Sequence, residues 1–246
     1  MNTRTTSTKR PQKIATDALF SRIQVEDSFK AKAYAALKEA ILKMDLYGKP
    51  EPIMLDEREL SDRLGVSRTP VREAVAMLEQ DGFLRTVPRR GILVVKKNKR
   101  EIIEMVQAWA ALEGMAARLI TVVATQADIQ SLRPMFAEFS ETHRPREHLN
   151  DYSSANIAFH QAIIRMSGCA LMSQITNTLF IHMRAVRAVT MGWDDRAQRS
   201  MRDHLAIIGA LERRDPDAAE RLAREHTLSL AAHIEAHGDQ IDGGPG

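Results

Sequence analysis

Apolar residues recur at helical spacing in two short segments, Leu60 to Leu64 and Val71 to Leu78, with a glycine between them. Asp56 precedes the first segment as a capping residue, and Gly65 marks the end of that helix. Ser67 then begins a second helix, whose first turn holds a proline at a position where its missing amide proton costs little. The pattern predicts a helix, a tight turn and a second helix.

After the second helix, the apolar pattern changes to two short runs that are typical of strands. The first run contains Phe83, Leu84 and Val87. The second run covers Ile92 to Val95, and the segment PRRG between the runs predicts a turn that holds its arginines outward as a wing. Together with a further helix upstream, Ala31 to Lys43, these elements predict a winged helix-turn-helix domain.

From Lys99 onward the apolar runs have helical spacing, and strand-forming runs are scarce. Short separators such as Asp215-Pro216 divide this part into six segments. Six helices with brief links predict an antiparallel all-α bundle, so the fold class is mainly α. The periodic runs lie at about 102–123, 127–142, 147–167, 170–191, 195–213 and 216–237.

These patterns divide the chain into a disordered arm at 1–27, the winged helix-turn-helix domain at 28–97, the helical domain at 98–238 and a flexible tail at 239–246. The net charge is +3, and the positive charge lies in the winged-helix segment, which favours nucleic acid as a partner. Cys169 is the single cysteine, which excludes an internal disulfide. With no secretory signal and no run of eighteen apolar residues, we expect a cytoplasmic protein without a membrane partner.

The segment ERELSDRLGVSRTPVREAVAMLEQDGFL and the PRRG that follows make up a long and specific motif. Almost position by position, this motif resembles the DNA-binding domain of the GntR family of bacterial transcription regulators. The resemblance implies that the chain binds double-stranded DNA. The residues that it assigns to DNA contact are Arg58, Ser67, Arg68, Thr69, Arg72, Arg90 and Gly91.

The chemistry of the second helix agrees with this assignment. Arg68 and Arg72 lie four positions apart, so they project together from a face other than the apolar stripe. Their forked guanidiniums match guanine O6 and N7, while Thr69 and the open amides of the helix start can meet phosphates. The alternative is an amphipathic helix pair with a solvated arginine face.

Four polar residues interrupt the apolar stripes of the predicted bundle. Asn156 and His160 share one helical face, and His204 and His226 lie within the stripes of two later helices. Three imidazoles and an amide oxygen are suitable donors for a first-row divalent metal such as zinc, nickel or manganese. Taken singly, each histidine is more often a core residue, so a hydrogen-bonded polar cluster is the alternative.

A second resemblance covers two segments of the bundle, NIAFHQAIIRMSGCALM and DHLAIIGALERRDPDAAERLAREH. They are similar to the FCD effector domain of the FadR branch of the GntR family, in its VanR-like subgroup of six helices. This implies a divalent metal at the three histidines and Asn156, beside a small carboxylate effector. Two departures bear on that site: Asn156 stands where many relatives carry aspartate, and Trp109 where an arginine often precedes the glutamate equivalent to Glu113.

The other candidates for effector contact are Trp109 and His182, for which core packing is the alternative. His182 shares a helical face with Leu179 and Val186, so we expect it to point into the bundle. Arg184 and Arg187 lie nearly opposite that stripe. We therefore expect both arginines to face solvent or a partner subunit.

Two functional classes fit these observations. The first is a homodimeric transcription regulator, acting as a repressor, that binds a palindromic operator and senses a small organic acid through a metal site. The second is a metal-dependent hydrolase or isomerase with an accessory nucleic-acid-binding domain. The metal donors have no adjacent glutamate or aspartate in a recognisable general-base position, which disfavours the enzyme. The modest charge and the internal polar site disfavour a nonspecific nucleoid protein.

Overall fold

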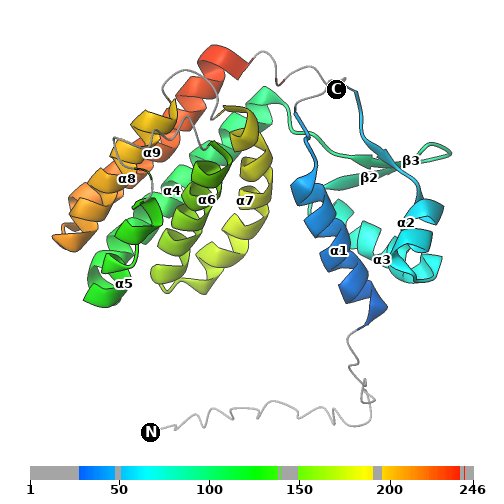
Figure 1. Ribbon diagram of the computed structural model, residues 1–246, viewed down its shortest axis with the longest axis horizontal. Coiled ribbons are helices and arrows are strands. Elements are labelled where there is room, and N and C mark those ends of the chain that lie inside the picture. The colour runs from blue at the N-terminus through cyan, green and yellow to red at the C-terminus, as the bar shows by residue number, and fades with distance from the viewer. Residues whose placement is uncertain are drawn as a thin grey trace, which may run out of the picture.

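The computed structural model describes residues 28–47, 51–137, 139, 149–190, 196–238 and 241. These residues form a small domain of helices and strands and a larger helical domain (Figure 1). The predicted arm, residues 1–27, lies outside the described residues, as does the predicted tail apart from residue 241.

The small domain is a winged helix-turn-helix, as the apolar pattern predicts. Its sheet is antiparallel with the strand order β1-β3-β2, and Leu84 pairs with Val94 along the two wing strands. Buried Leu37, Val71 and Leu78 join the helices to the sheet in one hydrophobic core. The elements are α1 (Phe29–Lys43), β1 (Met54–Leu55), α2 (Glu57–Leu64), α3 (Arg68–Gln80), β2 (Leu84–Val87) and β3 (Gly91–Val94).

The ends of the two central helices lie where the sequence predicts them. The Asp56 side chain accepts a hydrogen bond of 2.9 Å from the amide of Glu59 at the start of α2. Gly65 ends that helix in the left-handed conformation, with φ of 65°. Ser67 occupies the N-cap position of α3, but its side chain forms no capping hydrogen bond.

Strand β1 is an addition that the sequence pattern did not predict, because two residues are too few to show an alternation. It pairs with β3, where Leu55 lies opposite Ile92. Gly91 at the start of β3 has φ of 112°, and a Cβ atom there would lie 2.8 Å from the carbonyl oxygen of Leu55. The close approach of β1 to β3 therefore requires glycine at this position.

The large domain contains the six predicted helices, with one of them shorter than expected. The run at 127–142 forms α5 and a 3-10 turn instead of one helix, because Pro134 has no amide hydrogen with which to continue the α-helical pattern. Residue 138 and residues 140–148 lie outside the described part. The elements are α4 (Lys99–Val123), α5 (Gln126–Gln130), the 3-10 helix η2 (Arg133–Phe136), α6 (Leu149–Met166), α7 (Ala170–Thr190), α8 (Arg196–Glu212) and α9 (Pro216–His237).

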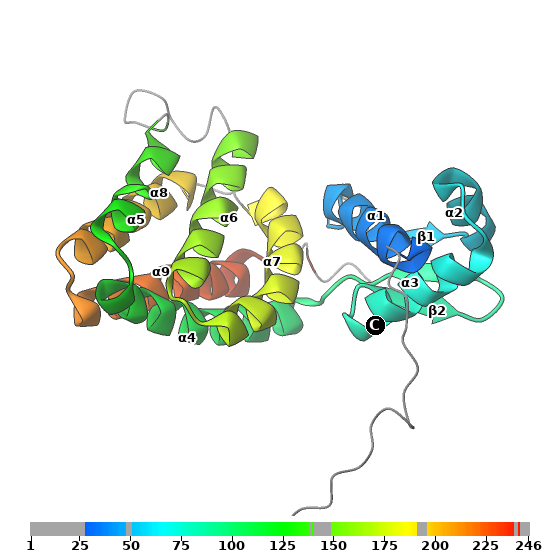
Figure 2. The same cartoon turned by 90° about the horizontal axis from the view of Figure 1, so that it is seen from below.

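Helix α4 connects the two domains and forms the centre of the bundle. It begins at a capping box, in which Asn98 and Glu101 exchange hydrogen bonds of 2.8 and 2.9 Å. It packs along α9 for much of its length (Figure 2). By length and composition alone α4 is able to cross a membrane, but half of its most apolar window is buried in the bundle. Its buried side chains include Glu113, so α4 has the character of a core helix.

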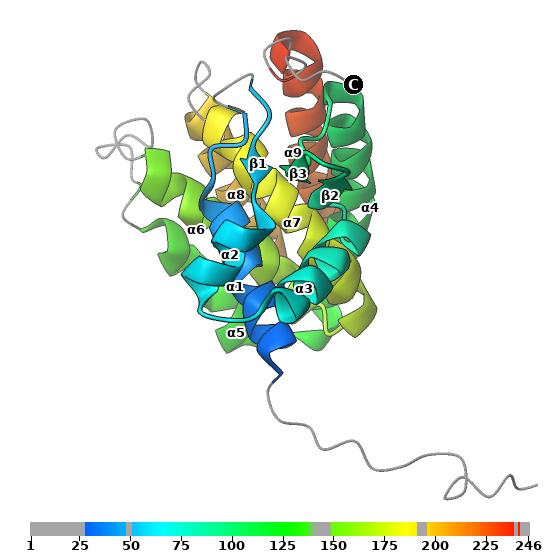
Figure 3. The same cartoon turned by 90° about the vertical axis from the view of Figure 1, so that its right-hand side faces the viewer.

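Helix α7 is the part of the bundle that lies against the DNA-binding domain. It passes next to α1 (Figures 2 and 3). The ring of His182 stacks on Phe83 with 4.6 Å between centroids, and Ile181 and Ala185 pack against the core of the small domain. The prediction that His182 points into the bundle is therefore wrong. This histidine is buried at the junction between the domains instead.

The position of His182 predicts a dependence of stability on pH. Burial lowers its pKa to about 4, and the charge of Lys97 acts in the same direction. The unfolded chain takes up this proton near pH 6.5, so the contribution to stability is complete above that pH and declines as the pH falls toward 4. At pH 5 the decline amounts to about 2 kcal/mol.

Urea unfolding at pH 7.5 and pH 5 measures this effect. Between pH 7.5 and pH 5 the free energy of unfolding should fall in both proteins. We expect the fall in His182→Phe to be about 2 kcal/mol smaller than in the unchanged protein. His237→Gln, at an exposed position of α9, is the matched control and should fall as the unchanged protein does. Equal losses in His182→Phe and the unchanged protein would show that His182 does not titrate in this way.

Candidate functional site

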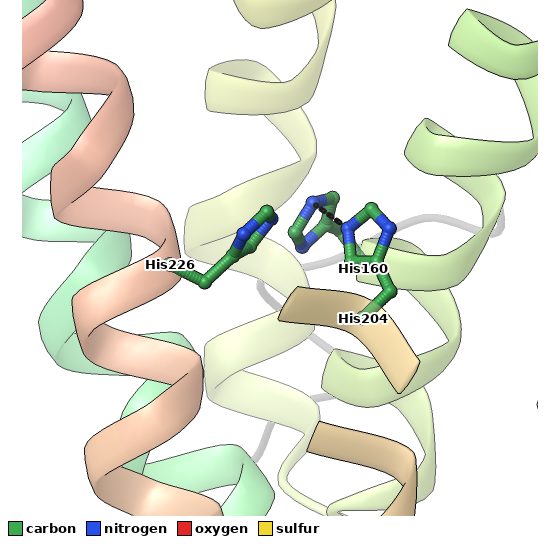
Figure 4. A group of neighbouring side chains, drawn as sticks. All are labelled: His160, His204 and His226. Carbon is green, nitrogen blue, oxygen red and sulfur yellow. Dashed lines mark hydrogen bonds between the residues drawn. The ribbon is translucent and has the colours of Figure 1, made fainter. Parts of the chain in front are cut away.

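Three buried histidines from three helices meet inside the bundle. His160 lies on α6, His204 on α8 and His226 on α9, and one ring nitrogen of each lies within 4.8 Å of the others. Figure 4 shows the three rings directed toward one another. The structure thus brings together the histidines that the sequence selects as metal ligands.

Each histidine is oriented by a partner on its Nδ1 atom. Nδ1 of His160 lies within hydrogen-bonding distance of a carboxylate oxygen of Glu113. Nδ1 of His204 lies 3.3 Å from the Tyr152 hydroxyl, and Nδ1 of His226 lies 3.1 Å from a carboxylate oxygen of Asp203. The three partners come from α4, α6 and α8, respectively. Metal-binding histidines are oriented in the same way, with one ring nitrogen held by a partner and the other left for the ligand side of the ring.

The spacing of the Nε2 atoms fits a metal centre. Nε2 of His160 and Nε2 of His204 are 3.4 Å apart. Two nitrogens on one tetrahedral ion, each about 2.0 to 2.1 Å from it, are separated by about 3.3 Å. His160 and His204 therefore already have the separation that a common ion requires, and a ring nitrogen of His226 lies within 4.8 Å of both.

Asn156 adds an amide group on the same helix, one turn before His160. Its Nδ2 atom donates a hydrogen bond of 3.0 Å to the hydroxyl of Ser200 on α8. Its Oδ1 atom is buried and has no hydrogen-bond partner among the described residues. The amide nitrogen lies 3.5 Å from Nε2 of His204, so Asn156 reaches the cluster through its donor atom and would have to turn its amide group over to place Oδ1 on a metal.

The electrostatic environment keeps the imidazoles in the form that binds metals. Burial lowers the pKa of His160 and of His204 well below the usual value, and it also lowers the pKa of His226. The positive charge of Arg187 acts in the same direction on all three histidines. Neutral imidazoles, the form that can coordinate a metal, are the consequence.

Glu113 is a buried carboxyl group beside these histidines. Burial raises its pKa to about 8, although the hydroxyl of Thr227 and the charge of Arg187 act in the opposite direction. Its two oxygens contact different side chains, His160 on one and Thr227 on the other. Glu113 thus orients His160 from outside the ring of candidate ligands.

Arg187 is part of the site, contrary to the expectation that it faces solvent. It is 1% exposed, and its Nη2 atom lies 3.0 Å from Nε2 of His160, to which it donates. The prediction used the face of His182 as the inward face of α7, whereas the residues that pack in the bundle core include Phe180, Met183 and Val186. Arg187 follows that second stripe. Arg184 is exposed, in agreement with the prediction.

Trp109 lies beside the cluster, whereas His182 does not. The Trp109 ring meets His160 edge to face at 4.7 Å between centroids, and the guanidinium of Arg187 lies over it at 5.2 Å. Its Nε1 atom is buried and has no hydrogen-bond partner among the described residues. Trp109 therefore remains a candidate for ligand contact, and the assignment of His182 to the effector site is withdrawn.

The predicted DNA-contacting residues lie at the start of α2, at the start of α3 and in the wing. The side chains of Arg68, Thr69 and Arg72 are exposed at the beginning of α3. Arg72 donates a hydrogen bond of 2.8 Å to Glu57, an ion pair that the sequence reasoning missed. The remaining predicted contacts are Arg58 on α2, Ser67 before α3, Arg90 in the turn of the wing and Gly91 at the start of β3.

Comparison with known proteins identifies both domains. Residues 29–94 match the model of the family described as bacterial regulatory proteins, gntR family, and residues 104–229 match the FCD domain, which alone covers half of the chain. The chain belongs to the GntR family of bacterial regulators. It is a DNA-binding transcription regulator of the branch with an FCD domain, and not a hydrolase or isomerase.

Relatives of this GntR regulator agree with that assignment. The HTH-type transcriptional repressor RspR of Escherichia coli K12 is 28% identical over 73% of this chain and 78% of its own length. The Glc operon transcriptional activator of the same organism is 25% identical over 83% of this chain and 86% of its own. The solved structure of E. coli McbR/YncC, 19% identical, covers 87% of this chain and 100% of that chain with a TM-score of 0.70, which shows the shared fold.

The sequence reasoning selected the histidines but missed the groups around them. Asp203 directly precedes His204 and contacts His226, and a carboxylate next to a candidate ligand is a signal that was available. Arg196 is 5% exposed near the start of α8, and only its position in the fold shows that it is buried. Arg187 was detectable only by taking the other face of α7 as the inward face.

Proposed function

We propose that this GntR regulator is a repressor whose affinity for a palindromic operator changes when a small carboxylate effector binds in the helical domain beside a divalent metal. The observation that carries the proposal is the convergence of His160, His204 and His226 on one buried point. The repressor assignment is supported by the likeness to RspR, which is described as a repressor. A carboxylate is the favoured effector because positively charged groups and hydrogen-bond donors are in excess around the three histidines.

The three histidines and Asn156 are the residues that would hold the metal, and Trp109 lies beside the effector position. A zinc, nickel or manganese ion bound there would supply positive charge and open positions for an anionic ligand. The neutral Asn156 leaves that charge less compensated than an aspartate would. We therefore expect the site to retain metal weakly and to favour an anion as an added ligand.

Arg187 connects occupancy of this site to the DNA-binding domain. Its Nη2 atom uses the same lone pair of His160 Nε2 that a metal requires, so Arg187 must release His160 when metal binds. Five positions earlier on the same helix, His182 stacks on Phe83 of the DNA-binding domain. A shift of α7 that accompanies the release of Arg187 would therefore reach the DNA-binding domain directly.

The DNA-binding surface has the residues that a winged helix-turn-helix uses. We assign Arg68 and Arg72 to base edges in the major groove, and Arg58, Ser67 and Thr69 to the backbone beside them. Arg90 and Gly91 place the wing against the neighbouring groove. The ion pair between Arg72 and Glu57 is exposed, so it is weak and opens at small cost when Arg72 reaches a base.

A twofold homodimer matches a palindromic operator, because each half-site takes one winged domain. Exposed apolar side chains recur along α4 and α7 of the bundle. A single exposed apolar residue is ordinary on a protein surface, but several on the same helices support association of two copies. They are Met115, Val122 and Val123 on α4, Leu171 and Ile175 on α7, and Leu228 on α9.

The operator assignment predicts the effect of Arg72→Ala. Loss of a forked contact to guanine should cost about 1 to 3 kcal/mol at the operator and flatten the preference at that base. Titration of operator and random DNA at two salt concentrations measures the change. Arg100→Ala is the control, since Arg100 is an exposed, ion-paired helix residue outside the DNA-binding domain.

Equal losses on operator and random DNA would assign Arg72 to phosphate contact instead of base recognition. Sedimentation of the same protein at micromolar concentration tests the dimer. A monomer that binds only half-sites would contradict the arrangement.

The metal assignment predicts that His204→Ala loses metal binding while operator binding remains nearly intact and becomes unresponsive to the effector. Elemental analysis after incubation with zinc, nickel and manganese, followed by dialysis, measures the metal. His237→Ala, an exposed histidine on α9, should retain it. Asn156→Asp should bind metal more tightly, because a carboxylate is a stronger ligand than an amide.

One pair of results would contradict this proposal. If the unchanged protein stays free of metal after incubation with all three ions, and His204→Ala responds to effector as the unchanged protein does, the four residues are a hydrogen-bonded polar cluster. The Asn156→Asp variant keeps the test informative if His204→Ala does not fold.

A further inference from the structure

Two arginines are buried at the histidine cluster without ion-pair partners among the described residues. Arg187 on α7 is 1% exposed, and Arg196 at the start of α8 is 5% exposed. Nε and Nη1 of Arg187 and Nε of Arg196 are buried and have no hydrogen-bond partner within the described part of the chain. Guanidinium groups are almost never buried without an anion, because removing their charge from water costs several kcal/mol.

The carboxylates nearest to the cluster are already engaged by histidines. Glu113 contacts His160 with one oxygen and Thr227 with the other. Asp203 contacts His226. Neither carboxylate forms an ion pair with Arg187 or Arg196, so among the described residues both guanidiniums lack a directly bound carboxylate.

We propose that the effector is a small dicarboxylate, with one carboxylate bound at Arg187 beside the histidine cluster and the other bound at Arg196. This inference rests on the proposed function, since it names the class of acid that the helical domain senses. Two separate guanidiniums, with two unpartnered nitrogens on Arg187 and one on Arg196, match two separate carboxylates, because the planar fork of arginine binds carboxylates well. A monocarboxylate would leave one buried guanidinium unmatched.

The surroundings of Arg196 provide access for such a ligand. A pocket of about 460 Å³ opens between α8 and α9, and its lining includes Arg196, Ser200 and Asp203. Ser200 also accepts the hydrogen bond from Asn156, which is one turn from His160. Arg196 therefore lies between an open pocket and the histidine cluster, and the volume is in the range of small-molecule sites.

Calorimetric titration of the zinc-loaded full-length protein tests the proposal. The probes are malonate, succinate and glutarate as dicarboxylates, acetate and lactate as monocarboxylates, and inorganic phosphate. We expect at least one dicarboxylate to bind tenfold or more tightly than either monocarboxylate and than phosphate. The three dicarboxylates differ in length, so the best of them reports the separation of the two binding positions.

Variants of Arg196 assign the second carboxylate. Arg196→Gln should weaken the best dicarboxylate at least tenfold, to the level of a monocarboxylate, and leave monocarboxylate binding unchanged. Arg196→Lys keeps the charge but loses the fork, so an intermediate loss is expected. Arg202→Gln is the matched control on α8, because Arg202 is exposed and lines the same pocket between α8 and α9. This variant should bind the acids as the unchanged protein does.

The proposal is overturned if a monocarboxylate or phosphate binds as tightly as every dicarboxylate, or if Arg196→Gln weakens both classes equally. If Arg202→Gln weakens dicarboxylate binding as much as Arg196→Gln does, the anion lies in the open part of the pocket between α8 and α9, and the proposal is overturned as well. In each of these cases acid sensing by the helical domain stands. Failure of every acid to bind, with no change in operator affinity, would overturn the proposed function along with this inference.

Discussion

Helix α7 contributes side chains to both hydrophobic cores of the molecule, and this shared packing sets the relation between ligand site and DNA-binding surface. One face carries Phe180, Met183 and Val186 into the bundle, and another carries Ile181, His182 and Ala185 against the DNA-binding domain. Because packed side chains allow few alternative arrangements, the helix cannot shift at one core without disturbing the other. Arg187 places a charged group of this helix directly on His160.

The interior of the bundle combines neutral imidazoles with buried cations. The Nδ1 atoms of the histidines are held by Glu113, Tyr152 and Asp203. The Nε2 atoms of His160 and His204 lie 3.4 Å apart, and Arg187 donates to that of His160. Arg187 and Arg196 add positive charge, and neither forms an ion pair with a carboxylate of the described residues. Buried polar groups in native proteins have partners, and a cluster with this many unmet donors and acceptors has the character of a binding site rather than of a core.

Much of this architecture was predictable from sequence, for physical reasons that differ between elements. The helix caps at Asp56 and Gly65 depend only on local sequence, and the structure confirms them. The helical period places His160, His204 and His226 on inward faces, and the structure buries all three. Strand β1 was not predictable because pairing with β3 creates it. His182 and Arg187 were assigned to the wrong surroundings, since a helix that packs on two sides has two apolar stripes and the sequence does not say which one faces the bundle. The candidate ligands came from the sequence, whereas their orienting partners needed the fold.

Diffraction from crystals grown with zinc, recorded at the zinc absorption edge, tests most directly that the cluster is a metal centre. We expect one anomalous peak in the bundle, within about 2.0 to 2.1 Å of a ring nitrogen of each histidine, with Arg187 released from His160 Nε2. Absence of a peak there, with the Arg187 Nη2 atom still donating to His160 Nε2, would contradict it.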